Sequence, residues 1–413
     1  MVITMTHYVK LAWRNIQRNR RRTIITASAI VMGVTMMIIV NGMITGMLDR
    51  TIANSVELET GHIKIYPEGY YEKSDLMPTN LHLTHTEIEG LIDGIDGITV
   101  KSPRIRAGGM LQTEEESTRV IINGINPGED LKVRDLKKRI IEGEYLTEGD
   151  EPSIMIGEPL SERFKIKLHD KVLLSSIASD GTPVSVSCTV RAVFSTKFSS
   201  YDSTMVFLSL QNAQTLLNIG EDVTEIVIMV DNPEHIDEVT ALLQQNLREN
   251  NYNYDVLHWE ELSPELAQFS EMEKSMSFLF LSIVIVVAAI GILNTMLMAV
   301  YERVKEVGVM AAFGYKSRDI LLLFVGEGLI IGVIGAVIGC ILGVGINYYL
   351  SVAGIDFAGA EVVEFMETRV YTRLTLSDVV YPFFFAVGIA LLAALYPAYR
   401  ASRLEPVEAL RHV

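Results

Sequence analysis

Cysteine is scarce in this sequence, and the two cysteines present are badly placed to pair. Cys188 lies in a mixed polar and apolar stretch, whereas Cys340 lies inside a long apolar run. If that run crosses a membrane, the two thiols cannot meet, so the sequence excludes a disulfide framework. We interpret both cysteines as packing residues.

The motifs of common catalytic and metal sites are also missing. The sequence has no HExxH, no Cys-x-x-Cys and no GxSxG, and no serine has an evident His/Asp partner. His62, His82 and His85 are scattered, and we interpret them as surface histidines. The acidic run 114–116 is read as a solvated loop rather than a cation site. We therefore expect no catalytic residue, no metal site and no cofactor.

Charge is almost absent from four long apolar runs. Three of them, 23–48, 275–301 and 379–399, have no charged residue, and the fourth, assigned to 320–350, has one, Glu327. A membrane-spanning helix needs about 20 apolar residues, so four transmembrane helices are predicted. The first run is too long for a cleaved signal peptide. The alternative for any one run is a buried helix of a soluble domain.

The balance of charge indicates a large soluble part and sets its side of the membrane. The chain has a net charge of −16 although 49% of its residues are hydrophobic, which suggests spans joined to an acidic domain. Basic residues gather in 1–22, 302–319 and 400–413, and the loop 351–378 is acidic. By the positive-inside rule, both termini and the 302–319 loop face the cytoplasm. The segment 49–274 then lies outside.

The outer segment has the pattern of a mixed α/β domain. Alternating strands are expected at 61–67 and 97–107, with a short helix between them at 85–95. The segment 224–259 reads as strand, helix and strand. Between these similar units, at about 127–210, lies a section rich in short strands. The sequence therefore predicts one base subdomain made from both ends and a β-rich insertion.

The residues before the first span form a basic stretch with two open interpretations. In 8–22, Tyr8, Leu11, Ala12 and Ile16 fall on one helical side and most basic residues on another. This pattern suits an amphipathic helix held by anionic lipid in the inner headgroup region. An ordinary positive-inside flank explains the same charges.

The third span carries a stripe of glycines and one carboxylate. The glycines recur every three or four residues, which allows another backbone to approach closely, and close helix packing is favoured over a substrate-lining surface. They are Gly328, Gly332, Gly335, Gly339 and Gly343. Glu327 lies near the inner end of this span. It is either a snorkelling or locally paired carboxylate, or a proton relay.

The stretch "ERVKEVGVMAAFGYKS", residues 302–317, superficially resembles a phosphate-binding loop. A Walker A loop has the form G-x-x-x-x-G-K-[ST] after a strand. Here five residues separate Gly308 from Gly314, Tyr315 stands before Lys316, and the preceding residues favour a helix. Nucleotide binding is excluded. A short cytoplasmic helix remains, with an apolar edge of Val304, Val307 and Ala311 and a C-terminal cap at Gly314.

Three motifs resemble one family. "ERVKEVGVMAAFGYKSRDI", "YPAYRASRLEPVEALR" at 396–411 and "LAWRNIQRNRRRT" at 11–23 are similar to segments of the MacB/FtsX/LolC-LolE superfamily of ABC transporter permeases. The order of the motifs and the predicted topology also match. The resemblance implies an α-helical membrane protein with four transmembrane helices and a large extracytoplasmic α/β domain, a MacB-like periplasmic core with a β-rich insertion.

The resemblance also implies partners and a coupling helix. The helix at 302–314 would dock on a separate ATPase subunit, in an assembly of two permease chains, identical or related, and two ATPase chains. Residues implied in docking are Glu302, Arg303, Glu306, Val307, Gly308, Ala311 and Gly314. The chain itself would be non-catalytic, would sit in the bacterial inner membrane among lipid, and would transmit ATPase-driven motion to its periplasmic domain. No nucleic-acid partner is expected.

Within the family, the match favours the lipoprotein-releasing LolC/LolE-type permeases. "ELETGHIKIYPEGYYEK", residues 57–73, resembles their "TGH.QI" region, and the length fits. One departure is "KLHDKVLL" at 167–174, where the family often has Gly-Asp. The function implied is release of lipoproteins from the inner membrane. The alternatives are MacB-like export of other amphiphiles and FtsX-like regulation of a cell-envelope hydrolase; a secondary transporter or an outer-face enzyme lacks support.

Overall fold

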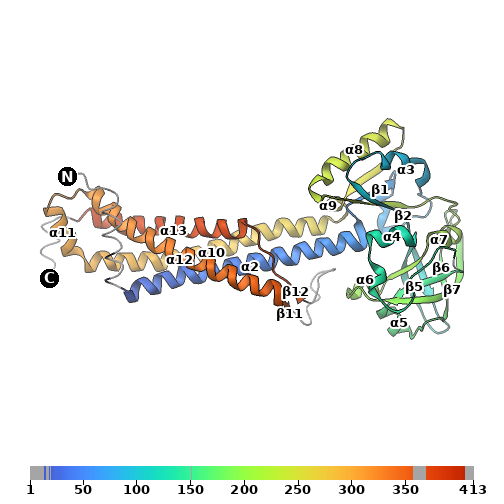
Figure 1. Cartoon of the computed structure of the whole chain (residues 1–413), viewed down its shortest axis with the longest axis horizontal. Helices are drawn as coiled ribbons and strands as arrows, with labels where there is room; N and C mark the ends of the chain where they lie inside the picture. Colours follow the sequence, from blue (N-terminus) through green and yellow to red (C-terminus); the bar gives the residue numbers. More distant parts are fainter. Residues whose placement is uncertain (1–13, 15–17, 19, 150, 357–368, 405–413) are drawn as a thin grey trace. The chain divides into compact units, whose positions relative to one another are not determined.

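The computed structural model describes the chain except for residues 1–13, 15–17, 19, 150, 357–368 and 405–413 (Figure 1). The chain divides into two compact units. The helical unit comprises Met1–Asp49, Ser270–Gly359 and Thr368–Val413. The sheet unit comprises Arg50–Phe269 and Ala360–Glu367, close to the range 49–274 expected for the outer domain. Most of the N-terminal helix expected at 1–22 lies outside the described residues, as do parts of the loop 351–378 and of the tail 400–413.

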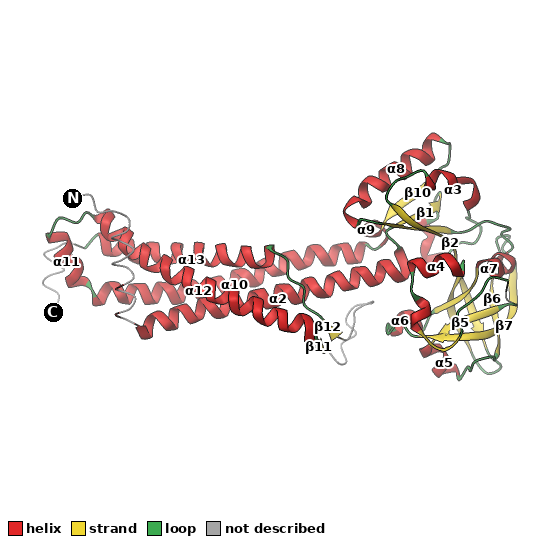
Figure 2. Cartoon of the chain, viewed as in Figure 1, coloured by secondary structure: helices red, strands yellow, loops and turns green. Residues whose placement is uncertain are grey.

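Long helices dominate the helical unit (Figure 2). Its described elements are α2 (Arg20–Ser55), α10 (Pro264–Glu302), α11 (Val304–Ala312), α12 (Ser317–Ala353), β11 (Ile355–Asp356), β12 (Arg369–Val370) and α13 (Ser377–Ser402). Among the described residues, Thr23–Thr60, Ser317–Ala353 and Ser377–Ser402 are long and apolar enough to cross a membrane. In α10 the corresponding described stretch, Ala289–Glu302, is shorter. The span at 275–301 and the count of four therefore stay predictions.

The helices of this unit bury one apolar core and leave apolar residues on the outside. The core draws on all of α2, α10, α11, α12 and α13, with buried residues that include Ile30, Val34, Ile38, Ile292, Met296, Val307, Phe324, Ala390 and Ala394. Outward-facing Phe278, Ile341 and Phe384 are exposed by about two thirds. An apolar surface of this kind suits contact with lipid rather than water.

The base of the sheet unit is an α/β layer that follows the expected pattern. Four strands lie in the order β10 (Tyr254–His258), β1 (Ile63–Pro67), β9 (Glu225–Val230) and β2 (Ile98–Gln112), all antiparallel. The helices α3 (His85–Asp93) and α8 (Ile236–Glu249) pack on the base sheet, because their apolar residues share its core. The strand and helix predictions for 61–67, 85–95, 97–107 and 224–259 are confirmed. On α8 the apolar residue Leu242 is exposed.

The second half of the sheet unit is a closed barrel. Its strands are β2, β3 (Ser117–Ile125), β8 (Met205–Ser209), β5 (Ser153–Gly157), β7 (Pro183–Phe194) and β6 (Lys171–Ile177). Each pairs with the next, and β6 returns to β2. The barrel thus begins before residue 127, the start expected for the insertion. The 15-residue strand β2 belongs to both parts, since its first half pairs with β9 and its second with β3 and β6.

Short elements complete the sheet unit. They are η1 (Val56–Thr60), η2 (Tyr71–Leu76), α4 (Pro127–Val133), η3 (Leu136–Arg139), β4 (Ile140–Gly143), α5 (Glu158–Phe164), α6 (Ser199–Asp202), α7 (Leu210–Leu217), η4 (Pro233–His235) and α9 (Trp259–Leu262). In the departure at 167–174, His169 has a φ of 69°, a left-handed conformation that glycine adopts more easily. Its N–H still donates to the Val190 carbonyl at 2.8 Å, so the turn forms without the glycine.

Candidate functional site: the α11 helix and its contacts

The candidate site is created by an interruption of the helical conformation between α10 and α11. α10 ends at Glu302 and α11 begins at Val304, with Arg303 at a φ of −114° between them. α11 ends near Gly314, whose φ of 89° lets the backbone turn, and the Gly314 N–H donates to the Ala311 carbonyl at 3.0 Å. α12 begins directly afterwards at Ser317. At its start, the Lys316 N–H donates to Asp319 Oδ2 at 2.9 Å. These caps make α11 a separate short helix between two long ones.

Arg303 connects α11 to α12 through a buried ion pair. Its Nη1 donates to Glu327 Oε1 at 2.8 Å, and the two residues are only 6% and 5% exposed. Its Nε donates to Glu306 Oε2 at 2.9 Å, and its guanidinium lies over the Phe324 ring. Of the two interpretations of Glu327, the structure supports the locally paired carboxylate.

Charges at the outer edge of this cluster extend it to the N-terminal segment. Arg18 Nη2 donates to Glu306 Oε1 at 2.6 Å. Burial would raise the pKa of Glu306, but the hydrogen bonds from Arg303 and Arg18 outweigh it and lower that pKa. Burial opposes the charge on Arg303 as well, yet Glu327 and Glu306 raise the pKa of its guanidinium. Glu306 and Arg303 therefore stay charged at neutral pH.

One face of α11 is buried in the helical unit, and the other is exposed. Val304 and Val307 are buried at 6% and 0% exposure within the helical unit, and Gly308 is buried with them. Val307 and Gly308, two of the residues that the resemblance implied in docking, thus pack within the helical unit. Ala311 is half-buried, while Glu302, Glu306 and Gly314 remain at the surface.

Two exposed apolar residues of α11 and its cap escaped the sequence interpretation. Val309 is 43% exposed and Phe313 is 82% exposed, and Lys305 lies on the same side of the helix. Residues four apart share a helical face, so the spacing of Lys305, Val309 and Phe313 was the signal available. Aromatic residues, phenylalanine included, are enriched in protein interfaces.

The glycine stripe of α12 lies against two neighbouring helices. A Cβ placed on Gly328 or Gly332 would stand 2.4 Å from the Cβ of Ala394 or Ala390 on α13. A Cβ on Gly335, Gly339 or Gly343 would meet Ile30, Val34 or Ile38 on α2 at 2.8 to 2.9 Å. Such distances leave no space for a side chain, so the stripe allows α12 to touch both helices at once.

A buried amide at the other end of α12 was also missed. Asn347 is 1% exposed, and its Nδ2 donates to the Ile38 carbonyl of α2 at 2.8 Å. The backbone carbonyl of Asn347 accepts from Thr372 Oγ1 at 2.8 Å. No local pattern marks one asparagine in an apolar run as a helix-to-helix contact, because its partners are distant in sequence.

The three predicted histidines differ in their surroundings. His62 is half-buried rather than a surface residue: its Nδ1 accepts from the Val230 N–H at 3.0 Å, and burial lowers its pKa. His82 is exposed and pairs with Asp222 at 2.6 Å. His85 is half-buried. Within the described ranges, no three His, Cys, Asp or Glu side chains are grouped so that they could hold a metal ion.

Comparisons with known proteins match both units. The MacB-like periplasmic core domain family matches residues 23–246, and the FtsX-like permease C-terminal family matches residues 278–406. The lipoprotein-releasing system transmembrane protein LolC of Neisseria meningitidis is 25% identical over 404 residues, covering 94% of each chain. The macrolide export ATP-binding/permease protein MacB of Bdellovibrio bacteriovorus is 33% identical over 160 residues, covering 38% of this chain and 22% of its own. The crystal structure of the periplasmic region of MacB from Actinobacillus actinomycetemcomitans aligns with 52% of this chain and 96% of its own, at 15% identity and a TM-score of 0.36.

Proposed function

This chain belongs to the MacB/FtsX/LolC superfamily of ABC transporter permeases, and we propose that it is the membrane subunit through which a separate ATPase drives its extracytoplasmic domain. The observation that carries the proposal is α11, a capped helix tied to α12 by the buried Arg303–Glu327 pair. A helix fixed in this way moves together with the span that follows it. Force applied to α11 therefore reaches the bundle.

The proposed dock for the ATPase is the exposed side of α11. It presents Lys305, Val309 and Phe313, with Glu302 and Gly314 at its ends. Arg303, Val307 and Gly308, which the family resemblance also implied in docking, act in this proposal by holding the helix from within, since they are buried. The assembly proposed is two permease chains with two ATPase chains in the bacterial inner membrane, with both termini and α11 on the cytoplasmic side.

Lipoproteins are the cargo we propose. The LolC relative covers almost the whole of both chains, whereas the MacB relative matches only a minor part of its own length. Thr60-Gly61-His62 lies in the region 57–73 that resembles the "TGH.QI" region of lipoprotein-releasing permeases. Gly61 has a φ of 64°, and a Cβ there would stand 2.3 Å from Val227 Cγ1, so this turn requires glycine. MacB-like export of other amphiphiles and FtsX-like hydrolase regulation are the alternatives.

Depletion of the chain tests the cargo. We expect lipoproteins destined for the outer membrane to accumulate in the inner membrane, because their extraction requires the driven outer domain. Membrane fractionation followed by lipoprotein labelling measures this, and expression of the wild-type chain from a plasmid should restore sorting. Normal lipoprotein sorting combined with defective cell-wall cleavage would favour the FtsX-like alternative, and normal sorting with retained amphiphilic compounds would favour export.

A pair of aspartate substitutions tests the dock. Val309→Asp with Phe313→Asp places two charges in the proposed interface while leaving the buried side of α11 intact. We expect co-purification of the ATPase to fall by about tenfold or more, as at interface positions that carry much of the binding energy. The isolated chain should hydrolyse no ATP, and activity should appear only with the partner.

Leu242→Asp is the matched control for the dock. Leu242 is 44% exposed on α8 in the sheet unit, so the substitution adds a charge at similar exposure far from α11 in sequence. ATPase binding should be unchanged in this variant. Full binding by the Val309/Phe313 variant, or ATP hydrolysis by the chain alone, would contradict the proposed docking.

A further inference from the structure

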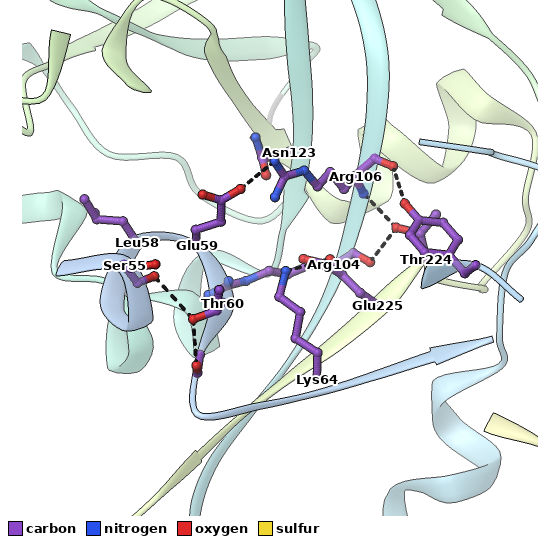
Figure 3. A network of polar contacts seen from close by, with 12 residues as sticks. Ser55, Leu58, Glu59, Thr60, Lys64, Arg104, Arg106, Asn123, Thr224 and Glu225 are labelled. Carbon is purple, nitrogen blue, oxygen red and sulfur yellow. Dashed lines mark hydrogen bonds and ion pairs between the residues drawn. The ribbon is translucent and has the colours of Figure 1, made fainter. Parts of the chain in front are cut away.

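A π-helical turn follows α2 at the start of the sheet unit. The turn η1 (Val56–Thr60) is closed by a bond from the Gly61 N–H to the Val56 carbonyl, five residues back, at 2.8 Å. Thr60 Oγ1 donates to the Gly61 carbonyl at 2.9 Å and contacts the Ser55 carbonyl (Figure 3). A π turn contains one residue more than an α-helical turn, is rare, and is frequently found at functional sites.

Consecutive residues of this turn are held by different parts of the sheet unit. Glu57 Oε1 accepts from Arg139 Nη2 of η3 at 2.8 Å. Glu59 Oε1 pairs with Arg106 Nη2 of β2 at 2.7 Å, as Figure 3 shows. Each side of the turn is thus gripped by an arginine from a different element.

The middle residue is held through its backbone. The Leu58 carbonyl accepts from Arg134 Nη1 and from the Tyr201 hydroxyl, both at 3.0 Å, and the Leu58 side chain is fully buried. Arg134 comes from the segment after α4, and Tyr201 comes from α6. Leu58 shares its apolar cluster with strands of the barrel, so the turn is joined to the barrel by both polar and apolar contacts.

Arg134, which donates to the Leu58 carbonyl, is itself fixed. Asp130 Oδ1 accepts from Arg134 Nε at 3.1 Å and from Nη2 at 2.9 Å, and it pairs with Arg104 Nη2 at 2.7 Å. Although burial opposes the charge on Arg134, Asp130 raises the pKa of this guanidinium. Buried ion networks are costly to form, and apolar packing can stabilise as much. Here the Asp130 carboxylate fixes the position of the Arg134 guanidinium beside the turn.

The turn also forms part of the wall of a cavity. The cavity has a volume of about 690 Å³ and is lined by Glu59, Thr60, Lys64, Tyr66, Tyr70 and Arg106, among others. Lys64 pairs with the buried Glu225 at 2.9 Å. Because Glu59 and Thr60 belong to η1, a shift of the turn changes the shape of this cavity. Movement of η1 therefore changes the space open to any molecule bound in this cavity.

We propose that the π turn η1 is the joint that passes displacement of α2 to the sheet unit. The Glu57–Arg139 pair and the Leu58 carbonyl pass it to the barrel, and the Glu59–Arg106 pair passes it to β2, the strand shared with the base. This inference rests on the proposed function, in which an ATPase drives the helices.

A charge swap at the joint tests this inference. The full chain, with its ATPase partner in lipid vesicles carrying a triacylated lipoprotein, is compared as wild type, Glu57→Arg, Arg139→Glu and the double variant. The two side chains are 34% and 23% exposed, so single reversals should not prevent folding. We expect each single variant to release about fivefold less lipoprotein per ATP hydrolysed, at an unchanged ATPase rate, and the double variant to recover, as for a coupling contact.

Lys138→Glu is the matched control for the swap, because Lys138 lies beside Arg139 in η3 but pairs with Asp135 on the surface. Its release per ATP should equal that of the wild type. Wild-type release in both single variants, or no recovery in the double variant, would overturn the joint. Failure of the wild-type complex to hydrolyse ATP or to release lipoprotein would instead overturn the proposed function, so the two failures are distinguishable.

Discussion

Glu327→Ala is expected to destabilise the chain by about 3–5 kcal/mol, the usual cost of removing one partner from a buried ion pair. The substitution leaves the Arg303 guanidinium at 6% exposure without its closest carboxylate. Glu306 remains paired with Arg303 Nε. Because this pair also ties α11 to α12, activation of the ATPase partner should weaken together with stability. Thermal unfolding of the detergent-solubilised chain and ATPase assays of the complex measure the two effects.

The double variant Arg303→Met with Glu327→Leu separates charge burial from coupling. Replacing both members of a buried pair by apolar residues of similar volume is often nearly neutral for stability. We therefore expect the double variant to unfold close to the wild-type temperature while its ATPase coupling stays reduced. A single Glu327→Ala variant within about 1 kcal/mol of wild type would show that the pair contributes little. Full coupling in the double variant would show that the Arg303–Glu327 pair has no mechanical role.

Gly328→Ala and Gly332→Ala are expected to destabilise the helical unit by about 1–3 kcal/mol each, as over-packing of a close contact does. The new methyl groups would stand 2.4 Å from the Cβ atoms of Ala394 and Ala390. The helix backbone fixes a Cβ atom in place, so neither can rotate away. α12 and α13 would have to separate. Thermal unfolding in detergent measures the loss, and co-purification with the ATPase reports whether the bundle still assembles.

Gly326→Ala and Gly345→Ala are the controls on the same helix. A Cβ at either position meets nothing within 4 Å. Alanine is favoured over glycine in a helix by about 0.5–1 kcal/mol, so these variants should be neutral or slightly more stable. Equal losses at all four positions would mean that the helix requires glycine for a reason other than close packing. Unchanged stability of Gly328→Ala and Gly332→Ala would contradict the packing assignment.

Local patterns predicted a large part of the architecture. The strands and helices of the base followed from alternation and from the apolar spacing of Ile236, Val239 and Leu247, because each pattern is complete within a few residues. The cap at Gly314 followed in the same way from one residue with special backbone freedom. The barrel did not. Its closure depends on β6 meeting β2, about sixty positions apart, and on β2 belonging to both the base and the barrel.

The candidate site was likewise predicted in part from local sequence and in part decided by contacts between distant residues. The sequence marked Arg303, Glu306 and Glu327 as charged residues near α11 but did not show that Arg303 joins the other two. It marked Val307 as apolar, which indicates burial equally well in a partner or in the chain itself. The structure settled this by placing Val307 in the core of the helical unit and leaving Phe313 exposed. Apolar character alone does not identify the surface that covers a residue.

Composition and local order alone determined that this chain has long apolar helices, a separate α/β domain, a short capped helix after residue 302 and a glycine stripe, because charge, hydropathy and periodicity act over a few neighbouring residues. Only the tertiary structure decided which helices the glycines touch, which face of α11 is free, and that arginines from three elements hold the turn after α2. Those contacts join residues far apart in the chain, and their energies depend on distance and burial, which exist only once the chain has folded.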